Sequence, residues 1–234
     1  MRISTWNCQG ALHKKLDVVE AIGADVQIIQ ECAEDAAIPG FQGLWYPPYA
    51  GAPKGTGVFV RNGWSIEWTE DRRWLPWVRS VSLSNTGTGV VFALLAVWTN
   101  VTKTEVRPNY AGQFAAVLDA YGEDIKRGKC IVAGDLNASR QGPSKAAHRA
   151  NLETAASLGL VSSYHHANEA GDEDEADMTL KWIGPGKKEY LYHCDFVFVS
   201  SDLLPGLQCS VLNTFDWPRR VSDHQPVIVD LQIY

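Results

Sequence analysis

The sequence predicts an α/β protein with mixed β-sheets whose outer faces are covered by helices. Strand-like and helix-like segments alternate irregularly along 234 residues, with several strands in succession between helices. No segment is long and polar enough to separate two domains, so we expect one domain over residues 1–234. The apolar fraction of 45% is ordinary for a globular protein and is sufficient for a sizeable core.

The first half of the chain predicts mostly strands. Arg2–Cys8 has strand-like alternation, and Lys15–Gly23 carries apolar residues at helical spacing before a terminal glycine. Asp25–Glu31 indicates a second strand. Pro39–Lys54 is rich in Pro, Gly and Tyr, which favours a loop. Further strands are predicted at Gly55–Val60, Trp64–Trp68, Val78–Ser84 and Val90–Val97.

The second half alternates helices and strands. Helices are predicted at Tyr110–Tyr121 and Lys145–Leu158, on either side of a strand at Cys130–Asn137. Residues 167–177 are strongly acidic, which favours a solvated surface loop over a metal site. The late strands are predicted at Leu191–Ser200 and Gln225–Ile233.

Composition limits the function classes. The net charge of −6 argues against a protein whose main role is to wrap duplex DNA, although it allows a local basic patch. Most of the nine tryptophans are expected to be structural. No apolar run reaches the ~18 residues of a transmembrane helix, and Met1–Trp6 enters a strand without a signal peptide. We expect a cytoplasmic protein with no membrane association and no obligate protein partner.

Five cysteines without CxxC spacing indicate reduced thiols. Three of them lie next to candidate site residues: Cys8 beside Asn7, Cys32 beside Glu31 and Cys194 beside Asp195. Because neighbours in a strand point to opposite faces, we expect these three thiols to face the core and not to act as ligands.

The segment Cys130–Asn137 is the most informative one. An apolar run ends in Gly134 and then delivers Asp135 and Asn137. If the strand continues, these two side chains share one face. Asp135 could then orient or deprotonate an attacking water, and Asn137 could donate to a phosphate oxygen.

Other predicted strand ends carry further polar groups. Glu31 is a natural Mg²⁺ ligand, Asn7 could help to hold that metal or a phosphate oxygen, and Asp223 could serve the metal side. His224, if cationic, would stabilise developing negative charge, and Asp195 is the predicted carboxylate partner that raises its pKa. Together these groups are the components of a metal-assisted phosphoester hydrolase.

In this order along the chain, the motifs resemble the endonuclease/exonuclease/phosphatase superfamily of DNase I-like and exonuclease III-like enzymes. Gly134–Asn137 reads GDLN, and Ser222–Pro226 reads SDHQP. The matching segments extend from the first strand to the last. They are Ser4–Gly10, Ile28–Glu31, Gly57–Val60, Val132–Asn137, Cys194–Ser200 and Ser222–Val227.

The resemblance implies a four-layer α/β/β/α sandwich of two mixed sheets flanked by helices, with the site between the sheets at one end. It also implies dependence on Mg²⁺ or Mn²⁺. The implied roles place Asn7, Glu31 and Asp223 at or near the metal. Asp135 and Asn137 act on the nucleophile and phosphate, while Asp195 orients His224.

The chain departs from the family pattern at Trp98. This residue ends the strand that usually offers His or Tyr to the phosphate. An indole has only an N–H donor, so Trp98 can contact substrate but cannot act as a general acid. A water or His224 would then have to protonate the leaving group.

Two further segments are predicted to contact substrate. Trp217 could stack on a base or sugar, and Arg219 or Arg220 could clamp a phosphate, although a packed surface loop is an equal alternative. Thr179 and Trp182 resemble the segment in which the family places substrate-side residues, and for Trp182 a packing role is an open alternative.

The leading hypothesis is a Mg²⁺-dependent phosphodiesterase, most simply an endonuclease or exonuclease acting on single-stranded or duplex nucleic acid. The alternative enzyme is a phosphatase or phosphodiesterase for a small metabolite or a lipid headgroup. A binding protein with a relic active site is a third hypothesis. The retained acids and His224 disfavour it.

Overall fold

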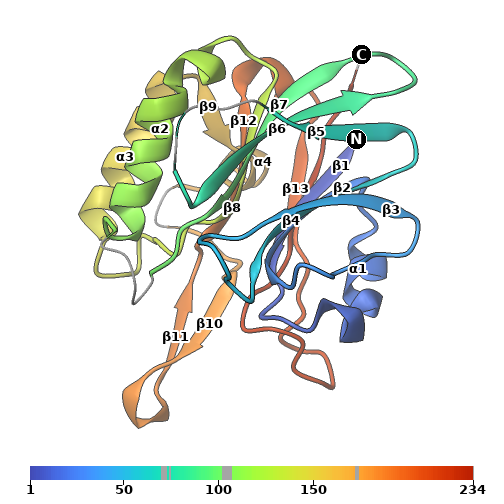
Figure 1. The fold of residues 1–234 in the computed structure, drawn as a ribbon. Helices are drawn as coiled ribbons and strands as arrows, with labels where there is room; N and C mark the ends of the chain where they lie inside the picture. Colours follow the sequence, from blue (N-terminus) through green and yellow to red (C-terminus); the bar gives the residue numbers. More distant parts are fainter. Residues whose placement is uncertain (70–72, 74, 102–106, 172–173, 234) are drawn as a thin grey trace.

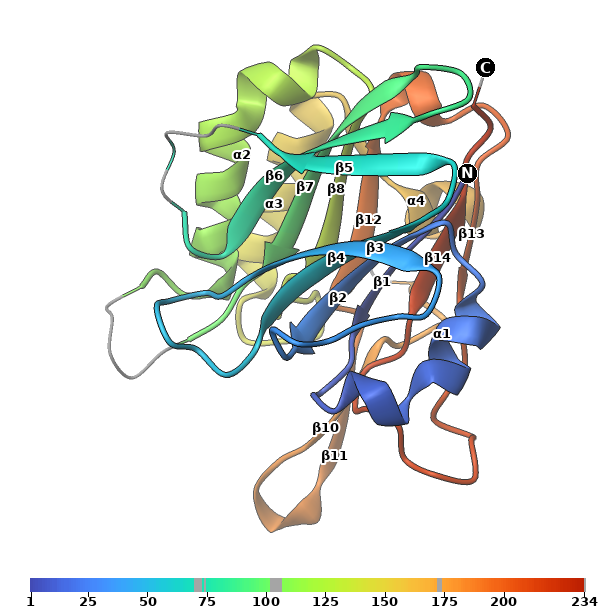
Figure 2. The same cartoon turned by 45° about the vertical axis from the view of Figure 1, so that its right-hand side comes forward.

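The computed structural model describes residues 1–69, 73, 75–101, 107–171 and 174–233. Within these residues, two six-stranded sheets pack against each other, and a separate two-stranded hairpin extends from one end (Figure 1). Each large sheet contains one parallel strand pair among antiparallel neighbours, so both are mixed. With helices on the outer faces (Figure 2), the chain forms the expected four-layer α/β/β/α sandwich.

The first sheet joins strands from both ends of the chain. Its elements are β1 (Arg2–Asn7), β2 (Val26–Cys32), β3 (Phe41–Tyr46), β4 (Gly55–Arg61), β13 (Gln208–Val211) and β14 (Val227–Asp230). The strand order is β13-β14-β1-β2-β4-β3. The helix α1 (Leu16–Ile22) forms the crossover between the parallel strands β1 and β2 and covers the outer face.

The second sheet contains strands from the middle of the chain. They are β5 (Trp64–Trp68), β6 (Val78–Asn85), β7 (Val91–Trp98), β8 (Cys130–Asp135), β9 (Leu160–Ser162) and β12 (Asp195–Ser200), in the order β5-β6-β7-β8-β12-β9. The helix α2 (Tyr110–Lys126) connects the parallel strands β7 and β8. The remaining elements are α3 (Lys145–Ser157), α4 (Ser163–Ala167), the hairpin strands β10 (Leu180–Ile183) and β11 (Glu189–Tyr192), and 3₁₀ turns at Leu12–Lys14, Pro185–Lys187 and Ser201–Leu203.

Three apolar clusters correspond to the three interfaces between layers. The central cluster joins the two sheets and includes Ile28 and Leu94, both fully buried. The second packs α2 and α3 on the second sheet, where the rings of Phe114 and Phe198 stack with centroids 5.6 Å apart. The third packs α1 on the first sheet around Trp6. Each such buried side chain stabilises the fold by roughly 1.5–3 kcal/mol, so the three clusters hold the strand ends in fixed positions.

The structure corrects several predicted boundaries. The loop predicted for Pro39–Lys54 is wrong in part, because Phe41–Tyr46 forms the edge strand β3. Its Gly43 breaks the apolar alternation, since the Phe59 ring lies where a side chain would project. The predicted strand Leu191–Ser200 is two strands from different sheets, and α2 continues five residues beyond its predicted end. The short elements β9, α4, β10 and β13 were not predicted.

The acidic segment 167–177 is only partly a solvated loop. Residues 172–173 lie outside the described part of the chain. Glu175 is buried, and its carboxylate accepts a hydrogen bond from Gln141 Nε2 at 2.8 Å and lies 3.3 Å from Nε2 of His165. Glu175 therefore attaches this segment to the body of the protein.

All five cysteines have free thiols, as expected for reduced cysteines. Among the described helices, none is both long enough and apolar enough to span a bilayer.

Candidate active site

The polar residues at the strand ends come together at one end of the sandwich. β1 and β2 are parallel, so Asn7 and Glu31 lie at the same edge of the first sheet. In the second sheet, Asp195 begins β12 and lies directly opposite Asp135 at the end of β8. Contacts between β1 and β8 bring the two edges together. The side chains that the sequence predicts as a site are therefore assembled by strand order and register.

A β-bulge aims Glu31 into the site. The pairing of β2 with β4 shifts between Gln30 and Cys32, and Glu31 has a φ of 59°. A residue at a bulge is unpaired and leaves the normal alternation of the strand. Glu31 Oε1 accepts a hydrogen bond from Asn7 Nδ2 at 3.2 Å, which joins the two predicted metal-site residues directly.

Asp135 and Asn137 lie together as predicted, but the predicted reason, a strand that continues through both residues, is wrong. β8 ends at Asp135, and Asn137 has a left-handed φ of 46°. The turn nevertheless brings them together, because the Asn137 backbone N–H donates to Asp135 Oδ1 at 2.8 Å and its Nδ2 donates to Oδ2 at 2.9 Å. The second hydrogen of that amide is directed to the Thr99 carbonyl at 3.0 Å. In this arrangement Asn137 positions Asp135 and does not offer its amide hydrogens to a phosphate.

Gly134, which precedes Asp135, is required by close packing. A Cβ at this position would lie 1.7 Å from the carbonyl oxygen of Val97 in the neighbouring strand. We expect Gly134→Ala to lower the free energy of unfolding by about 3 kcal/mol, as overpacking does when backbone must move. At roughly 2–4 °C per kcal/mol for a domain of this size, thermal melting should show a fall of about 6–12 °C.

Gly87→Ala is the matched control for Gly134→Ala. Its Cβ would meet only an Asn85 side-chain oxygen, at 3.4 Å. Equal melting temperatures for the two variants would contradict the packing argument.

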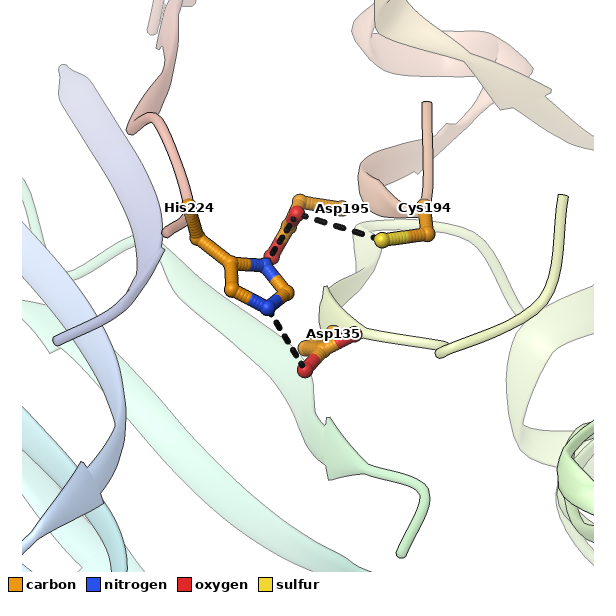
Figure 3. Close-up of side chains that lie close together, drawn as sticks. All are labelled: Asp135, Cys194, Asp195 and His224. Atoms are coloured by element: carbon orange, nitrogen blue, oxygen red, sulfur yellow. Dashed lines mark hydrogen bonds and ion pairs between the residues drawn. The ribbon is translucent and has the colours of Figure 1, made fainter. Parts of the chain in front are cut away.

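Asp195 and His224 form a buried hydrogen-bonded pair beside Asp135 (Figure 3). His224 Nδ1 lies 2.9 Å from Asp195 Oδ2, and His224 Nε2 lies 3.9 Å from Asp135 Oδ2. The imidazole is thus placed between two carboxylates, with the Asp195 pairing that the sequence predicts. The loop holding His224 is attached to β1, because the Ser222 hydroxyl donates to the Asn7 carbonyl at 2.7 Å and accepts from the His224 N–H at 3.0 Å.

The charges of this cluster are set by burial and by mutual attraction. Burial lowers the pKa of His224, but the Asp195 and Asp135 carboxylates offset that effect and raise the pKa to about 10. Burial raises the pKa of Asp135 to about 7, and the His224 charge opposes the rise. At neutral pH the imidazole is therefore a cation, and Asp135 is close to its titration point.

The oxygen donors around Asn7 fit a hard divalent cation. Asn7 Nδ2 donates to Glu31 Oε1 and also, at 3.0 Å, to Asp135 Oδ2, so the amide bridges two carboxylates. Asp223 is linked to this group through Gln9, whose backbone N–H donates to Asn7 Oδ1 and whose Nε2 donates to Asp223 Oδ2 at 2.9 Å. Carboxylates and amide oxygens are the protein ligands that Mg²⁺ prefers.

Lys54 and Gln9 belong to this site but were not predicted from the sequence. Lys54 Nζ forms an ion pair with Glu31 Oε2 at 2.6 Å. Lys54 immediately precedes β4, which runs antiparallel to β2, so it lies at the same sheet edge as Glu31. Knowledge of this pairing would have identified Lys54. Gln9 follows Asn7 in a left-handed conformation (φ 53°), for which no signal was recognised.

Cys194 is buried as predicted, but it does not point away from the site. Its Sγ lies 3.6 Å from Asp195 Oδ2 (Figure 3), and with Asp135, Asp195 and His224 it forms a compact cluster of possible ligand atoms. The alternation argument is wrong here because Cys194 precedes β12 and is not part of the strand. Burial raises the pKa of Cys194, so the group remains a thiol at neutral pH.

Thr179 positions the backbone at the start of β12 and is not exposed to substrate. The residue is fully buried, and its hydroxyl oxygen accepts the backbone N–H groups of Cys194 at 3.0 Å and Asp195 at 3.1 Å. These bonds fix the start of β12 and the position of the Asp195 carboxylate. This geometry argues against the substrate contact expected for Thr179.

A short antiparallel ladder joins the root of the hairpin to the His224 segment. Leu180 forms a β-bridge with His224. The Lys181 N–H donates to the Asp223 carbonyl at 2.8 Å, and the Gln225 N–H donates to the Thr179 carbonyl at 2.7 Å. The His224 segment and the hairpin are therefore parts of one hydrogen-bonded unit.

The remaining predicted substrate residues lie in three different places. Trp217 and Arg220 line a cavity of about 270 Å³ that includes Asp223, and Arg220 lies 3.8 Å from the Asp223 carboxylate. Arg219 instead pairs with Asp17 on α1, which argues against the expected phosphate contact. Trp98 lies opposite Asp135 in the β7–β8 register and is half-buried, at the edge of the site.

One comparison with known proteins identifies a family. The model of the Endonuclease/Exonuclease/phosphatase family matches residues 4–224 of the chain. None of the curated protein sequences compared with the chain matches it.

Several solved structures share the fold over nearly their full length. The endonuclease domain of TRAS1, a telomere-specific non-LTR retrotransposon, is 18% identical with a TM-score of 0.71, covering 99% of this chain and 98% of its own. The 3'-5' exonuclease NExo from Neisseria meningitidis is 19% identical with a TM-score of 0.70, covering 100% of both chains. The AP endonuclease LMAP from Leishmania major is 15% identical with a TM-score of 0.70, covering 97% of this chain and 86% of its own.

Proposed function

The chain belongs to the Endonuclease/Exonuclease/phosphatase family of phosphoester hydrolases, and we propose that it is a divalent-metal-dependent phosphodiesterase that cleaves nucleic acid. The observation that carries the proposal is the arrangement of His224 between Asp195 and Asp135, with Asn7 bridging Asp135 to Glu31. A proton acceptor, a buried cation and a group of oxygen donors lie within one cluster. These are the elements that phosphodiester hydrolysis requires.

The protein groups have distinct proposed roles. Asp135 accepts a proton from the attacking water through Oδ2, the oxygen that faces His224. His224, held as a cation by Asp195, stabilises the negative charge that develops on the phosphate oxygens. Asn137 and Asn7 hold Asp135 in a fixed orientation by donating to its carboxylate. Trp98, at the strand end beside Asp135, is proposed to contact the substrate without transferring a proton.

Mg²⁺ or Mn²⁺ is the proposed cofactor. Glu31 and Asn7 would hold it, with Asp223 on the same side of the site. Such an ion polarises phosphate oxygens and neutralises part of their charge. Lys54 keeps positive charge at Glu31 Oε2, so it is proposed to leave that carboxylate when the metal binds.

A cleavage assay tests the function. Labelled single-stranded DNA, duplex DNA, duplex DNA with an abasic site and RNA are incubated with Mg²⁺ or with EDTA, beside the Asp135→Asn variant. Cleavage that requires Mg²⁺ and is absent from the variant supports a nuclease. If none of the four substrates is cleaved, the nuclease proposal is refuted, and a small phosphoester or a lipid headgroup is favoured as the substrate.

Glu31→Gln should act on the metal requirement. The variant keeps the size of the side chain but removes a charged ligand, so we expect the Mg²⁺ concentration for half-maximal activity to rise about tenfold or more. A Mg²⁺ titration of activity measures this. Glu34→Gln, three residues further along the chain, is the control and should leave the titration unchanged. An unchanged midpoint for Glu31→Gln would remove this residue from the metal site.

A further inference from the structure

The hairpin formed by β10 and β11 has two chemically different faces. It projects from the sandwich in both views (Figures 1 and 2). Leu180 pairs with Tyr192 and Trp182 pairs with Tyr190, and cross-strand partners lie on the same face of a sheet. The first face therefore carries only large apolar and aromatic side chains. The opposite face carries Lys181, Ile183, Glu189 and Leu191.

The rings of the first face form a continuous series. The Trp182 and Tyr190 centroids are 5.3 Å apart, and the Tyr190 and Tyr192 rings are nearly parallel, with an angle of 3° and a separation of 6.4 Å. Trp182 is 44% exposed although it is among the largest apolar side chains. An aromatic series that is left open to solvent is a stacking surface for planar groups.

This aromatic face forms one wall of a cavity of about 500 Å³. Leu180, Trp182 and Tyr192 line it from the hairpin, while Asn137 and Cys194 line it from the catalytic cluster. Since the Cys194 thiol contacts the Asp195 carboxylate that holds His224, the cavity begins one side chain away from the reacting groups. Its volume is in the range of small-ligand pockets.

The chemistry of the cavity fits a nucleobase better than a phosphate. The described residues that line it include no Lys, Arg, Asp or Glu. Asn109 and Tyr110, at the start of α2, also line it, and both side chains carry polar groups. A base has apolar faces for stacking and a polar edge for such groups. Lys187 and Lys188, in the turn of the hairpin, add positive charge for a nucleic-acid backbone.

We propose that this cavity receives an intact, unpaired nucleobase adjacent to the scissile phosphate, and that the aromatic face of the hairpin stacks the following bases. The inference rests on the proposed nuclease activity and specifies its substrate as single-stranded nucleic acid that retains its bases. A base in a duplex is stacked and paired, so it would first have to leave the helix at a cost of a few kcal/mol.

Equilibrium binding in EDTA tests the cavity without turnover. The probes are a labelled oligothymidylate and a deoxyribose-phosphate chain of the same length that lacks every base. The wild-type protein should bind the oligothymidylate at least tenfold more tightly. Trp182→Ala should remove about tenfold of this preference, as loss of one stacked base does, and leave the Kd of the baseless chain unchanged. Trp182→Phe, which retains a ring, should restore most of it.

Leu191→Ala is the matched control, because Leu191 lies on the opposite face of the same hairpin and is also exposed, at 47%. Its binding should equal that of the wild-type protein. Equal Kd values of the wild-type protein for the two probes, or equal losses in Trp182→Ala and Leu191→Ala, would overturn the proposal. Oligouridylate, measured in the same assay, compares RNA with DNA. A thymidylate–adenylate duplex should bind more weakly than the single-stranded oligothymidylate.

Cleavage of the baseless deoxyribose-phosphate chain with Mg²⁺ separates this inference from the proposed function. That substrate has phosphodiesters but no planar group for the cavity to bind, and Leu191→Ala should cleave it at the same rate as the wild-type protein. Mg²⁺-dependent cleavage of this chain and of DNA without any preference for bases would retain the nuclease and refute the base cavity. Absence of both activities would refute the proposed nuclease. The binding assay would still test whether the cavity binds a nucleobase.

Discussion

Asp135→Asn should reduce the turnover number for phosphodiester cleavage by about three orders of magnitude, within the 10²–10⁴ range of general acid–base catalysis. The amide has nearly the same shape as the carboxylate but cannot accept the proton of the attacking water. It also removes one of two buried carboxylates that lie opposite each other, which relieves their repulsion, but it leaves the N–H donors of Asn7 and Asn137 with one acceptor oxygen fewer. Steady-state cleavage at saturating Mg²⁺ and thermal unfolding of the same samples measure the two effects separately.

Asp230→Asn is the matched control for this prediction. Asp230 lies at the other end of β14 and pairs with Arg2, away from the cluster. It should keep wild-type turnover. If Asp135→Asn retained more than about a tenth of wild-type turnover, Asp135 would have no role as the proton acceptor.

His224→Ala should lower the turnover number about 10²- to 10³-fold, because a buried cation directed at the phosphate is lost. The pH profile identifies the charge as the cause. Asp195 and Asp135 raise the pKa of His224 to about 10, so the imidazolium persists through neutral pH and is lost as the pH rises through that value. In the wild-type protein kcat/KM should therefore fall above about pH 10.

Asp195→Asn provides the second test of His224. Without the carboxylate that accepts from Nδ1, the His224 pKa should fall, and the basic limb of the profile should move to lower pH. A basic limb at the same pH in Asp195→Asn and wild-type protein would show that another group produces it.

Much of the site could be predicted because strand ends and polar residues coincide in the sequence. Glu31 lies at the end of a predicted strand and Asp135 near the end of another, and the family resemblance indicated Asp195, within the predicted strand Leu191–Ser200, as the partner of His224. The structure brings these groups together as expected. Their orientations were less predictable. The bulge at Glu31 and the left-handed turn at Asn137 depend on pairing with neighbouring strands, which alternation within one segment does not reveal.

The residues that were missed or misplaced are those whose contacts cross between distant segments. Lys54 lies in what was predicted to be a loop, and its role follows only from the antiparallel pairing of β4 with β2. Thr179 was expected to contact substrate, yet it is fully buried against the start of β12. Arg219 was expected at a phosphate, but α1 provides an acid for it. For such side chains, polarity alone does not distinguish a ligand-binding group from a supporting one.

The backbone hydrogen bonds at the root of the hairpin also define which hairpin residues can be replaced without moving His224. Thr179, Leu180 and Lys181 share backbone hydrogen bonds and a bridge with the His224 segment, whereas the chain beyond them contacts its own partner strand. We therefore expect residues 182–190 to tolerate exchange without displacing His224. A graft that began a few residues earlier would disrupt the backbone hydrogen bonds that position His224. Sequence differences among natural or engineered variants should therefore be more frequent in residues 182–190 than in residues 179–181.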